Sequence, residues 1–407
     1  MVARVLLVTT VCWPSGARIA AAFAKSGAAV AAVFPRTHVL ADSRYPGAKF
    51  EYKPLAALTS LRASIVAAKP DLLVPLDDRA VRLLVDLARH ERASSIAQVI
   101  ERSLGDITRY PGLISRKGFI EAARNAGVRA PETLALVSEH DLEEAIAELG
   151  LPLVIKSDGS WGGDGVAVAH TREEARAAWR KMSAPASRLR NLARAGLRKD
   201  AHFARDAFFR TKAHVSAQAY VAGTPATTAF AAWNGELVAA IHMDVVSPDS
   251  GTGPACILSR AACGEMDEAA RKLARKFGLS GLHGLDFMRD GAGQAHLIEI
   301  NPRATQTSHL AFGEGADLPA ALLAAHDGSP AFTRRAIENA SVALFPQAWL
   351  ADPASPHLQS AHHDVPWDDL GVLRRCIAMG AIPAAKGEKT AITPRSSEAR
   401  SQLLTIP

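Results

Sequence analysis

Runs of apolar residues alternate with amphipathic stretches along the first part of the chain. Continuous apolar runs predict buried strands, because a strand covered on both faces carries few polar residues. Apolar residues at helical spacing predict the helices between them. The expected strands are Arg4–Thr9, Ala28–Phe34 and Asp71–Leu76, and the expected helices are Ser15–Ser26, Leu61–Lys69 and Arg79–His90. This alternation predicts a parallel sheet with helices on its faces.

The pattern changes near Ser115, where longer helices and paired strands begin. Helices are expected at Ser115–Ala126, Asp141–Leu149, from Thr171 and at Met266–Phe277, and strands at Leu151–Lys156, Val166–Ala169, His214–Val221, Ala226–Trp233, Leu237–Asp244, Leu282–Arg289 and Ala295–Ile300. Turn-like pairs at Ala222–Gly223 and Asn234–Gly235 predict two hairpins. After about Ser329 the chain is punctuated by proline, which suggests a small appended lobe.

Length and composition limit the class of protein. The 407 residues, 48% hydrophobic and 22% charged, are typical of a globular protein with two or three domains. Lys and Arg exceed Asp and Glu by 47 to 41, and this net charge of +6 is too small to indicate nucleic-acid binding by itself. Four scattered cysteines without a CxxC pair fit a reducing, cytoplasmic location. No apolar run approaches the length of a membrane span.

The most informative segment is the hairpin Gly281–Arg303. Glu299 and Asn301 are two apart on one strand and therefore share a face. If the turn covers Asp290–Gly293, Asp286 faces Leu297 and joins both on that face. Two carboxylates and a carboxamide suit a hard cation such as Mg²⁺. The alternative is a solvated hairpin whose outer face carries acids.

A second segment, Leu151–Val166, carries glycines behind a lysine. The strand delivers Lys156 to a loop with Gly159, Gly162, Gly163 and Gly165. Glycines let backbone N–H groups approach phosphate oxygens, and lysine adds a positive charge. The segment lacks the G-x-x-x-x-G-K-[ST] pattern, which disfavours a P-loop enzyme. A flexible turn without a ligand is the alternative.

These two segments, in this order, resemble the ATP-grasp superfamily over roughly residues 1–330. The resemblance implies an α/β protein: an N-terminal parallel α/β domain (1–115), a two-lobed ATP-grasp α+β domain (116–329) with a mobile lid (about 151–221), and an appended segment (330–407). It implies that Lys156 binds nucleotide phosphates, assisted by Lys117, which precedes NAGVRAP. Asp286, Glu299 and Asn301 match the residues that hold magnesium in the family.

The resemblance also implies a nucleotide contact between the lobes and a role for the arginine after the hairpin. VSAQAYVAG resembles the family's hinge, so Gln218, Tyr220 and Val221 are candidate adenine contacts. Ala219 departs from the pattern, where an acid is common, and leaves the ribose contact unassigned. Arg303 is placed to steady a carboxylate or an oxyanion.

The function implied is that of an ATP-dependent carboxylate–amine ligase. ATP and Mg²⁺, with Mn²⁺ as an alternative, would activate a small acid (an amino acid is one candidate) as an acyl phosphate, and an amine would then form the amide, with ADP and phosphate released. Carboxylation, small-molecule phosphorylation and a catalytically silent nucleotide-binding protein are the alternatives. Small-molecule substrates are expected as partners, without nucleic acid or membrane, and a homodimer is one assembly considered.

Several other residues carry weaker signals. Asp77 and Asp78 end a strand at a sheet edge that often lines a ligand crevice, although helix capping is the favoured interpretation. His309 is expected to be structural, and Arg260 is equally compatible with an anion contact and a solvated surface. The basic stretch Arg188–Lys212 favours a solvated face over nucleic-acid binding.

Overall fold

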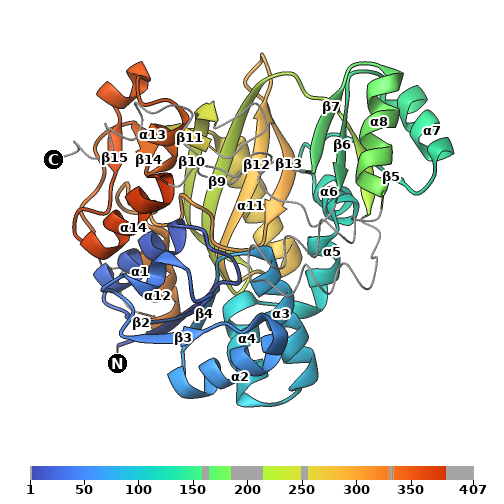
Figure 1. Cartoon of the computed structure of the whole chain (residues 1–407). Coiled ribbons are helices and arrows are strands. Elements are labelled where there is room, and N and C mark those ends of the chain that lie inside the picture. Colours follow the sequence, from blue (N-terminus) through green and yellow to red (C-terminus); the bar gives the residue numbers. More distant parts are fainter. Residues whose placement is uncertain are drawn as a thin grey trace.

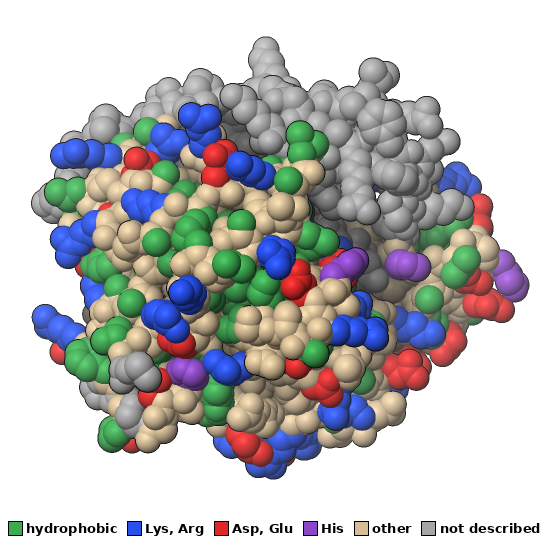
Figure 2. All heavy atoms as spheres, turned by 90° about the horizontal axis from the view of Figure 1, so that it is seen from below, with side chains coloured by type: hydrophobic (Ala, Val, Ile, Leu, Met, Phe, Trp, Pro, Cys, Tyr) green, Lys and Arg blue, Asp and Glu red, His purple; other side chains and the backbone are tan. Residues whose placement is uncertain are grey.

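The computed structural model describes residues 2–157, 165–184, 214–248, 255–328, 330, 332 and 334–381. Three sheets organise these residues, and Figure 1 shows the N-terminal sheet below, the large central sheet above it and a smaller sheet to one side. None of the described helices is long and apolar enough to span a membrane. On the face seen in Figure 2, described basic and acidic side chains are interspersed over the surface.

The N-terminal sheet is parallel, with the strand order β3-β2-β1-β4. Its strands are β1 (Arg4–Val8), β2 (Ala29–Phe34), β3 (Ala48–Glu51) and β4 (Leu72–Pro75). Leu7 packs on the side of α1, and Leu6 packs on the side of α3, because successive side chains alternate between faces. The surrounding helices are α1 (Ser15–Lys25), α2 (Ala57–Ala68), α3 (Asp78–His90) and α4 (Ser95–Leu104), with short turns η1 (Val39–Ala41) and η2 (Pro54–Ala56). The predicted parallel α/β unit is confirmed.

A four-stranded antiparallel sheet forms the smaller lobe. Its order is β5-β8-β6-β7, with bounds Thr133–Leu136, Val215–Ala219, Leu153–Ser157 and Val166–Ala169. Helices α7 (Glu139–Leu149) and α8 (Arg172–Ser183) cover one face, where Leu142 and Ile146 pack against Leu153 and Ile155. Lys156 alternates with these apolar residues and therefore lies on the face away from the two helices.

The seven-stranded sheet forms the body of the molecule. Its order is β13-β12-β9-β10-β11-β14-β15, with bounds Ala295–Asn301, Gly281–Arg289, Thr224–Trp233, Glu236–Pro248, Ala255–Arg260, Ser341–Leu344 and His362–Asp364. Helix α11 (Gly264–Phe277) packs on one face, where Leu273 joins Leu285 and Phe287 in one core. Helix α12 (Leu318–Asp327) packs against β9 and β10 with the second core. Between the N-terminal sheet and the smaller lobe lie η3 (Ile107–Arg109), α5 (Tyr110–Ile114) and α6 (Arg116–Asn125).

The described C-terminal residues complete this large sheet. Strand β14 pairs with β11, and β15 adds parallel to β14. They are accompanied by α13 (Gln347–Ala351), η4 (Pro356–Gln359) and α14 (Leu370–Ala381). Asp364 of β15 contacts His309 at 2.8 Å and also pairs with Arg18 of α1. These residues therefore join the sheet and the N-terminal domain, where the sequence suggested an appended lobe.

One predicted hairpin is wrong. Strands β8 and β9 belong to different sheets, so Ala222–Gly223 lies in a connection between two lobes and not in a tight turn. A Cβ atom at Gly223 would lie 2.0 Å from the carbonyl oxygen of Arg289, so the connection passes close to the end of β12. The other expected turn, Asn234–Gly235, is confirmed by the pairing of Trp233 with Glu236.

Candidate functional site

Asp286 and Glu299 stand directly opposite each other on β12 and β13. The expected pairing of Asp286 with Leu297 is wrong, because Leu297 pairs with Phe287. The turn is one residue longer than expected, since Arg289 pairs with Ala295. This extra residue alone would turn Glu299 to the other face. A β-bulge next to Asp286 restores the alignment, so both carboxylates lie on the face away from α11.

A chain of polar contacts runs from these carboxylates to the N-terminal domain. The Asn301 Nδ2 amide donates to Asp286 Oδ2 at 2.9 Å, and Arg303 donates through NH2 to Asn301 Oδ1 at 2.9 Å. The Arg303 Nε then lies 3.4 Å from Asp78 Oδ1 at the start of α3. The backbone N–H of Ala304 donates to the carbonyl of Pro75 at 3.0 Å and fixes the two segments to each other.

The two carboxylates repel each other. Burial, followed by the nearby negative charge of Glu299, raises the pKa of Asp286 to about 6. The hydrogen bonds from the Thr227 and Asn301 side chains and the charge of Arg303 offset part of this rise. A pair of this kind binds a divalent cation favourably, because the cation removes the repulsion between the two ionised groups.

Lys156 reaches the same place from the smaller lobe. It is 5% exposed, and its Nζ lies 3.5 Å from the carbonyl oxygen of Ile298 on β13. Burial lowers its pKa to about 8, against an opposing effect of Glu299. The nearby charge of Arg116 lowers it further. Lys156 therefore bridges the two sheets beside the carboxylates.

Arg116 is a site residue that the sequence reasoning missed. It begins α6, and its NH2 lies 3.4 Å from Glu299 Oε2, with only 17% of its side chain exposed. Lys117, the residue expected to assist Lys156, is exposed on the same helix. Its predicted role in phosphate binding stays a prediction. The two positions are adjacent, and only the rotation of α6 decides which side chain faces the carboxylates.

The candidate adenine contacts lie at the connection between the two lobes. Gln218 is the last buried residue of β8, and its Nε2 donates a hydrogen bond to Thr133 Oγ1 at 3.0 Å. Tyr220 is 41% exposed and Val221 is half-buried. Gln218 lies in β8, and Tyr220 and Val221 lie in the connection that leads to β9. The contact of these three residues with a nucleotide stays a prediction.

Part of the glycine-rich loop lies outside the described residues. Gly159, Gly162 and Gly163 belong to this part, as does the basic stretch 188–212. Gly165 is described, and its carbonyl oxygen accepts a hydrogen bond from the N–H of Ser157 at 2.9 Å. This bond closes the base of the loop where β6 leads into it.

Other candidate residues have structural partners. Asp77 caps α3, as predicted, and accepts hydrogen bonds from Thr9, Thr10 and Ala80. His309 is buried against Asp364, in agreement with the structural interpretation. Arg260 is exposed and lies over the ring of Phe312.

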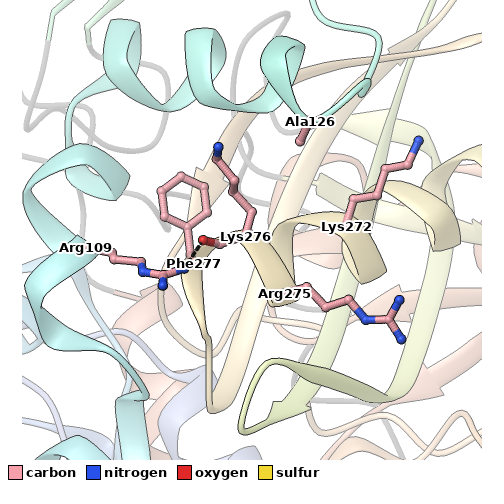
Figure 3. A pocket seen from close by; sticks show the side chains of 6 residues that line it. All are labelled: Arg109, Ala126, Lys272, Arg275, Lys276 and Phe277. Atoms are coloured by element: carbon pink, nitrogen blue, oxygen red, sulfur yellow. Dashed lines mark hydrogen bonds between the residues drawn. The ribbon is translucent and has the colours of Figure 1, made fainter.

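A cavity of about 680 Å³ lies away from the carboxylates, beside α11 (Figure 3). Its lining is basic, but three of its cations already have acidic neighbours. Arg109 pairs with Asp106 at 2.8 Å and Arg275 with Glu236 at 2.9 Å, while Lys272 lies 3.7 Å from Glu268. The remaining lining residues are Ala126, Lys276 and Phe277. Arg275 and Lys276 also lie in the last turn of α11, where cations offset the helix dipole.

Comparisons with known proteins agree with this geometry. A family profile described as "ATP-grasp in the biosynthetic pathway with Ter operon" matches residues 218–345. No curated protein matches the chain in sequence. Among solved structures, carboxyaminoimidazole ribonucleotide synthase from Aspergillus clavatus, complexed with ATP, is similar with a TM-score of 0.57 at 14% identity, over 82% of this chain and 78% of that one.

Two further solved structures are similar over most of their length. The N5-carboxyaminoimidazole ribonucleotide synthetase from Thermus thermophilus has a TM-score of 0.57 at 14% identity, over 81% of this chain and 79% of that one. Biotin carboxylase from Campylobacter jejuni has a TM-score of 0.56 at 14% identity, over 82% and 72%. The chain therefore has the ATP-grasp fold. Its resemblance to the ATP-grasp superfamily, predicted from the two motif segments, is confirmed.

Proposed function

We propose that this protein is an ATP-dependent ligase that joins a small carboxylic acid to an amine through an acyl phosphate. The observation that carries the proposal is the convergence of two cations on one carboxylate pair. Lys156 comes from the smaller lobe and Arg116 from α6, while Asp286 and Glu299 come from the large sheet. Phosphoryl transfer needs such a site, because positive groups must neutralise the charge on the transferred phosphate.

The residues present fit Mg²⁺. Asp286 and Glu299 supply hard oxygen donors, and their mutual repulsion is the electrostatic condition that a divalent cation relieves. The Asn301 side chain is tied to both Asp286 and Arg303, so it fixes the orientation of the carboxylate. When bound, Mg²⁺ would neutralise charge on the phosphates of ATP.

The chain's own groups account for the two chemical steps. Lys156 and Arg116 hold the triphosphate while a carboxylate oxygen of the substrate attacks the γ-phosphorus, and the bond to the ADP oxygen breaks. Arg303, held by Asn301 and Asp78, lies where it stabilises the carboxylate and then the oxyanion of the tetrahedral intermediate. The amine nitrogen attacks the acyl carbon, the bond from that carbon to the phosphate oxygen breaks, and the proton lost by the nitrogen leaves with the phosphate.

Carboxylation is a second candidate, favoured by the names of the similar structures. The carboxyaminoimidazole synthetases and biotin carboxylase are named for carboxylated products or for carboxylation. In that case bicarbonate takes the place of the carboxylic acid, and the same groups bind the phosphates. The two candidates differ only in the acid that receives the phosphoryl group.

A product screen separates these proposals. Purified protein is incubated with MgATP and pooled amino acids, dicarboxylates or bicarbonate, each with hydroxylamine as a general trap for acyl phosphates. We expect ADP, phosphate and one hydroxamate, detected by mass spectrometry. Glu299→Ala should abolish this product, and Asp86→Asn, on the exposed part of α3, should not. AMP and pyrophosphate as products would contradict the acyl-phosphate route. Absence of nucleotide binding, with no product formed from any of the acids, would contradict the whole proposal.

A further inference from the structure

The N-terminal domain contributes one carboxylate to the candidate active site. Strand β4 ends at Pro75, and the chain turns through two aspartates into α3. Because the N–H of Ala304 donates to the Pro75 carbonyl at 3.0 Å, this turn lies against the residues that follow β13. The carboxyl edge of the N-terminal sheet thus meets the end of the metal-site hairpin.

The two aspartates of this turn differ in what they contact. Asp77 is 2% exposed, and its oxygens accept hydrogen bonds from the backbone and hydroxyl groups of the loop after β1 and from α3. Its carboxylate is therefore used by the fold. Asp78 has 38% of its side chain exposed and contacts the Nε of Arg303 at 3.4 Å. The Asp78 side chain thus contacts the arginine and is still partly exposed.

Arg303 keeps hydrogen-bonding capacity in this position. Its NH2 donates to Asn301 at 2.9 Å and its NH1 to the Ala304 carbonyl at 3.3 Å, while its buried Nε makes no hydrogen bond of good geometry. A guanidinium has five N–H donors, so Arg303 can also donate hydrogen bonds to the oxygens of a substrate. The acyl group of the intermediate is thereby expected beside Arg303, within reach of Asp78.

We infer that Asp78 is a specificity-determining residue that binds the acceptor as an ammonium ion, so that the acceptor is a primary amine and not an alcohol or a neutral amide. The ammonium ion gives one proton to the Asp78 carboxylate, and the free amine then attacks the acyl carbon. The inference rests on the proposed function. The amine must lie against the acyl carbon when it attacks, and Arg303 joins that position to Asp78. Asp286 and Glu299 are assigned to the cation and the phosphates, and Asp77 is saturated by the fold. Among these carboxylates of the described site, Asp78 is therefore the one that can bind a cationic acceptor.

A purely structural role for Asp78 predicts a different effect of its replacement by asparagine. If the residue only orients Arg303, a neutral oxygen acceptor at this position preserves most of its effect. Asp78→Asn keeps the shape and an acceptor oxygen but removes the charge that an ammonium needs. The matched control is Asp86→Asn, which removes an exposed carboxylate from the same helix.

The test measures the binding of two simple probes, propylammonium and its neutral isostere n-propanol, by saturation-transfer difference NMR. Each is titrated into the wild-type protein, Asp78→Asn and Asp86→Asn, with and without MgADP. We expect the wild type and Asp86→Asn to favour propylammonium over n-propanol, and Asp78→Asn to bind propylammonium about tenfold more weakly. Thermal unfolding of the three proteins shows that each is folded.

The outcomes separate the inference from the function on which it rests. Equal binding of both probes to the wild type, or an unchanged preference in Asp78→Asn, overturns the role of Asp78. The hydroxylamine screen is run in parallel on the wild-type protein. Loss of propylammonium binding in Asp78→Asn, with Asp86→Asn unchanged, supports the inference. Absence of hydroxamate from the wild type contradicts the proposed ligase and leaves the probe-binding result to decide on Asp78.

Discussion

The buried carboxylate of Asp286 is expected to lower the free energy of unfolding of the ligand-free protein. Its pKa rises from an ordinary 3.8 to about 6, chiefly through burial and then through Glu299. A rise of this size corresponds to roughly 3 kcal/mol of unfavourable free energy for the ionised form in the folded chain. Solvent around the partly exposed carboxylate reduces this to about 1–2 kcal/mol. Asp286→Asn should therefore stabilise the protein by about 1–2 kcal/mol near neutral pH.

The destabilisation caused by Asp286 depends on pH. Above pH 6 the carboxylate is ionised in both folded and unfolded chains, and the full destabilisation is present. As pH falls from about 6 to about 4, the folded chain binds its proton first and the destabilisation disappears. The stability gain of Asp286→Asn should accordingly be large at about pH 7.5 and small at about pH 4.

Urea unfolding followed by tryptophan fluorescence at both pH values provides the assay, with Asp86→Asn as the control. ATP-dependent turnover is measured on the same proteins and should be lost in Asp286→Asn. A variant that is no more stable than the wild type at neutral pH refutes the electrostatic reasoning. An equal gain at both pH values also refutes it, because a packing effect does not depend on the proton.

Three other predictions concern the proposed nucleotide site and the connection between the lobes. Arg116→Ala should weaken ADP binding by about tenfold, and Lys117→Ala on the exposed side of the helix by less than about twofold; calorimetric titration of both reveals whether the contacting arginine matters more. Because the pKa of Asp286 is near 6, protons compete with Mg²⁺ below that pH, so the Mg²⁺ needed for half-maximal ADP binding should rise as pH falls. An unchanged requirement between about pH 5 and pH 7.5 would count against the metal assignment. Gly223→Ala places a Cβ 2.0 Å from a carbonyl oxygen of β12 and should lower stability by about 2 kcal/mol. Gly264→Ala, where the new atom meets open space, is the control, and equal melting temperatures for the two variants would contradict the close approach.

The sequence was sufficient for the strands and helices whose patterns are local. The alternation of apolar runs and helical stretches in the first domain, and the order of the two motif segments, predicted the fold. The pairing of Asp286 was not accessible in the same way, because turn length and bulge position together set the register. Apolar alternation in β13 does not reveal a single extra residue.

The sequence also could not decide between adjacent residues or predict which distant strands pair. Arg116 and Lys117 are both cations at the start of one helix, and the choice between them depends on how α6 packs against β13. Strand β14 is four residues long and pairs with β11, far earlier in the chain. Nothing in so short a segment identifies its partner, since strand pairing of this kind is decided by tertiary packing.

The late position of β14 has a consequence for how the protein is made. During synthesis the strand β11 is present well before Ser341–Leu344 leave the ribosome, so one side of its backbone lacks its final partner. An unpaired strand edge is a template for association with other chains. A chain that ends before β14 would leave this edge open permanently, so truncation of the C-terminal segment should produce aggregation in place of a smaller working enzyme. Strand β14 thus protects the edge of β11 during and after translation.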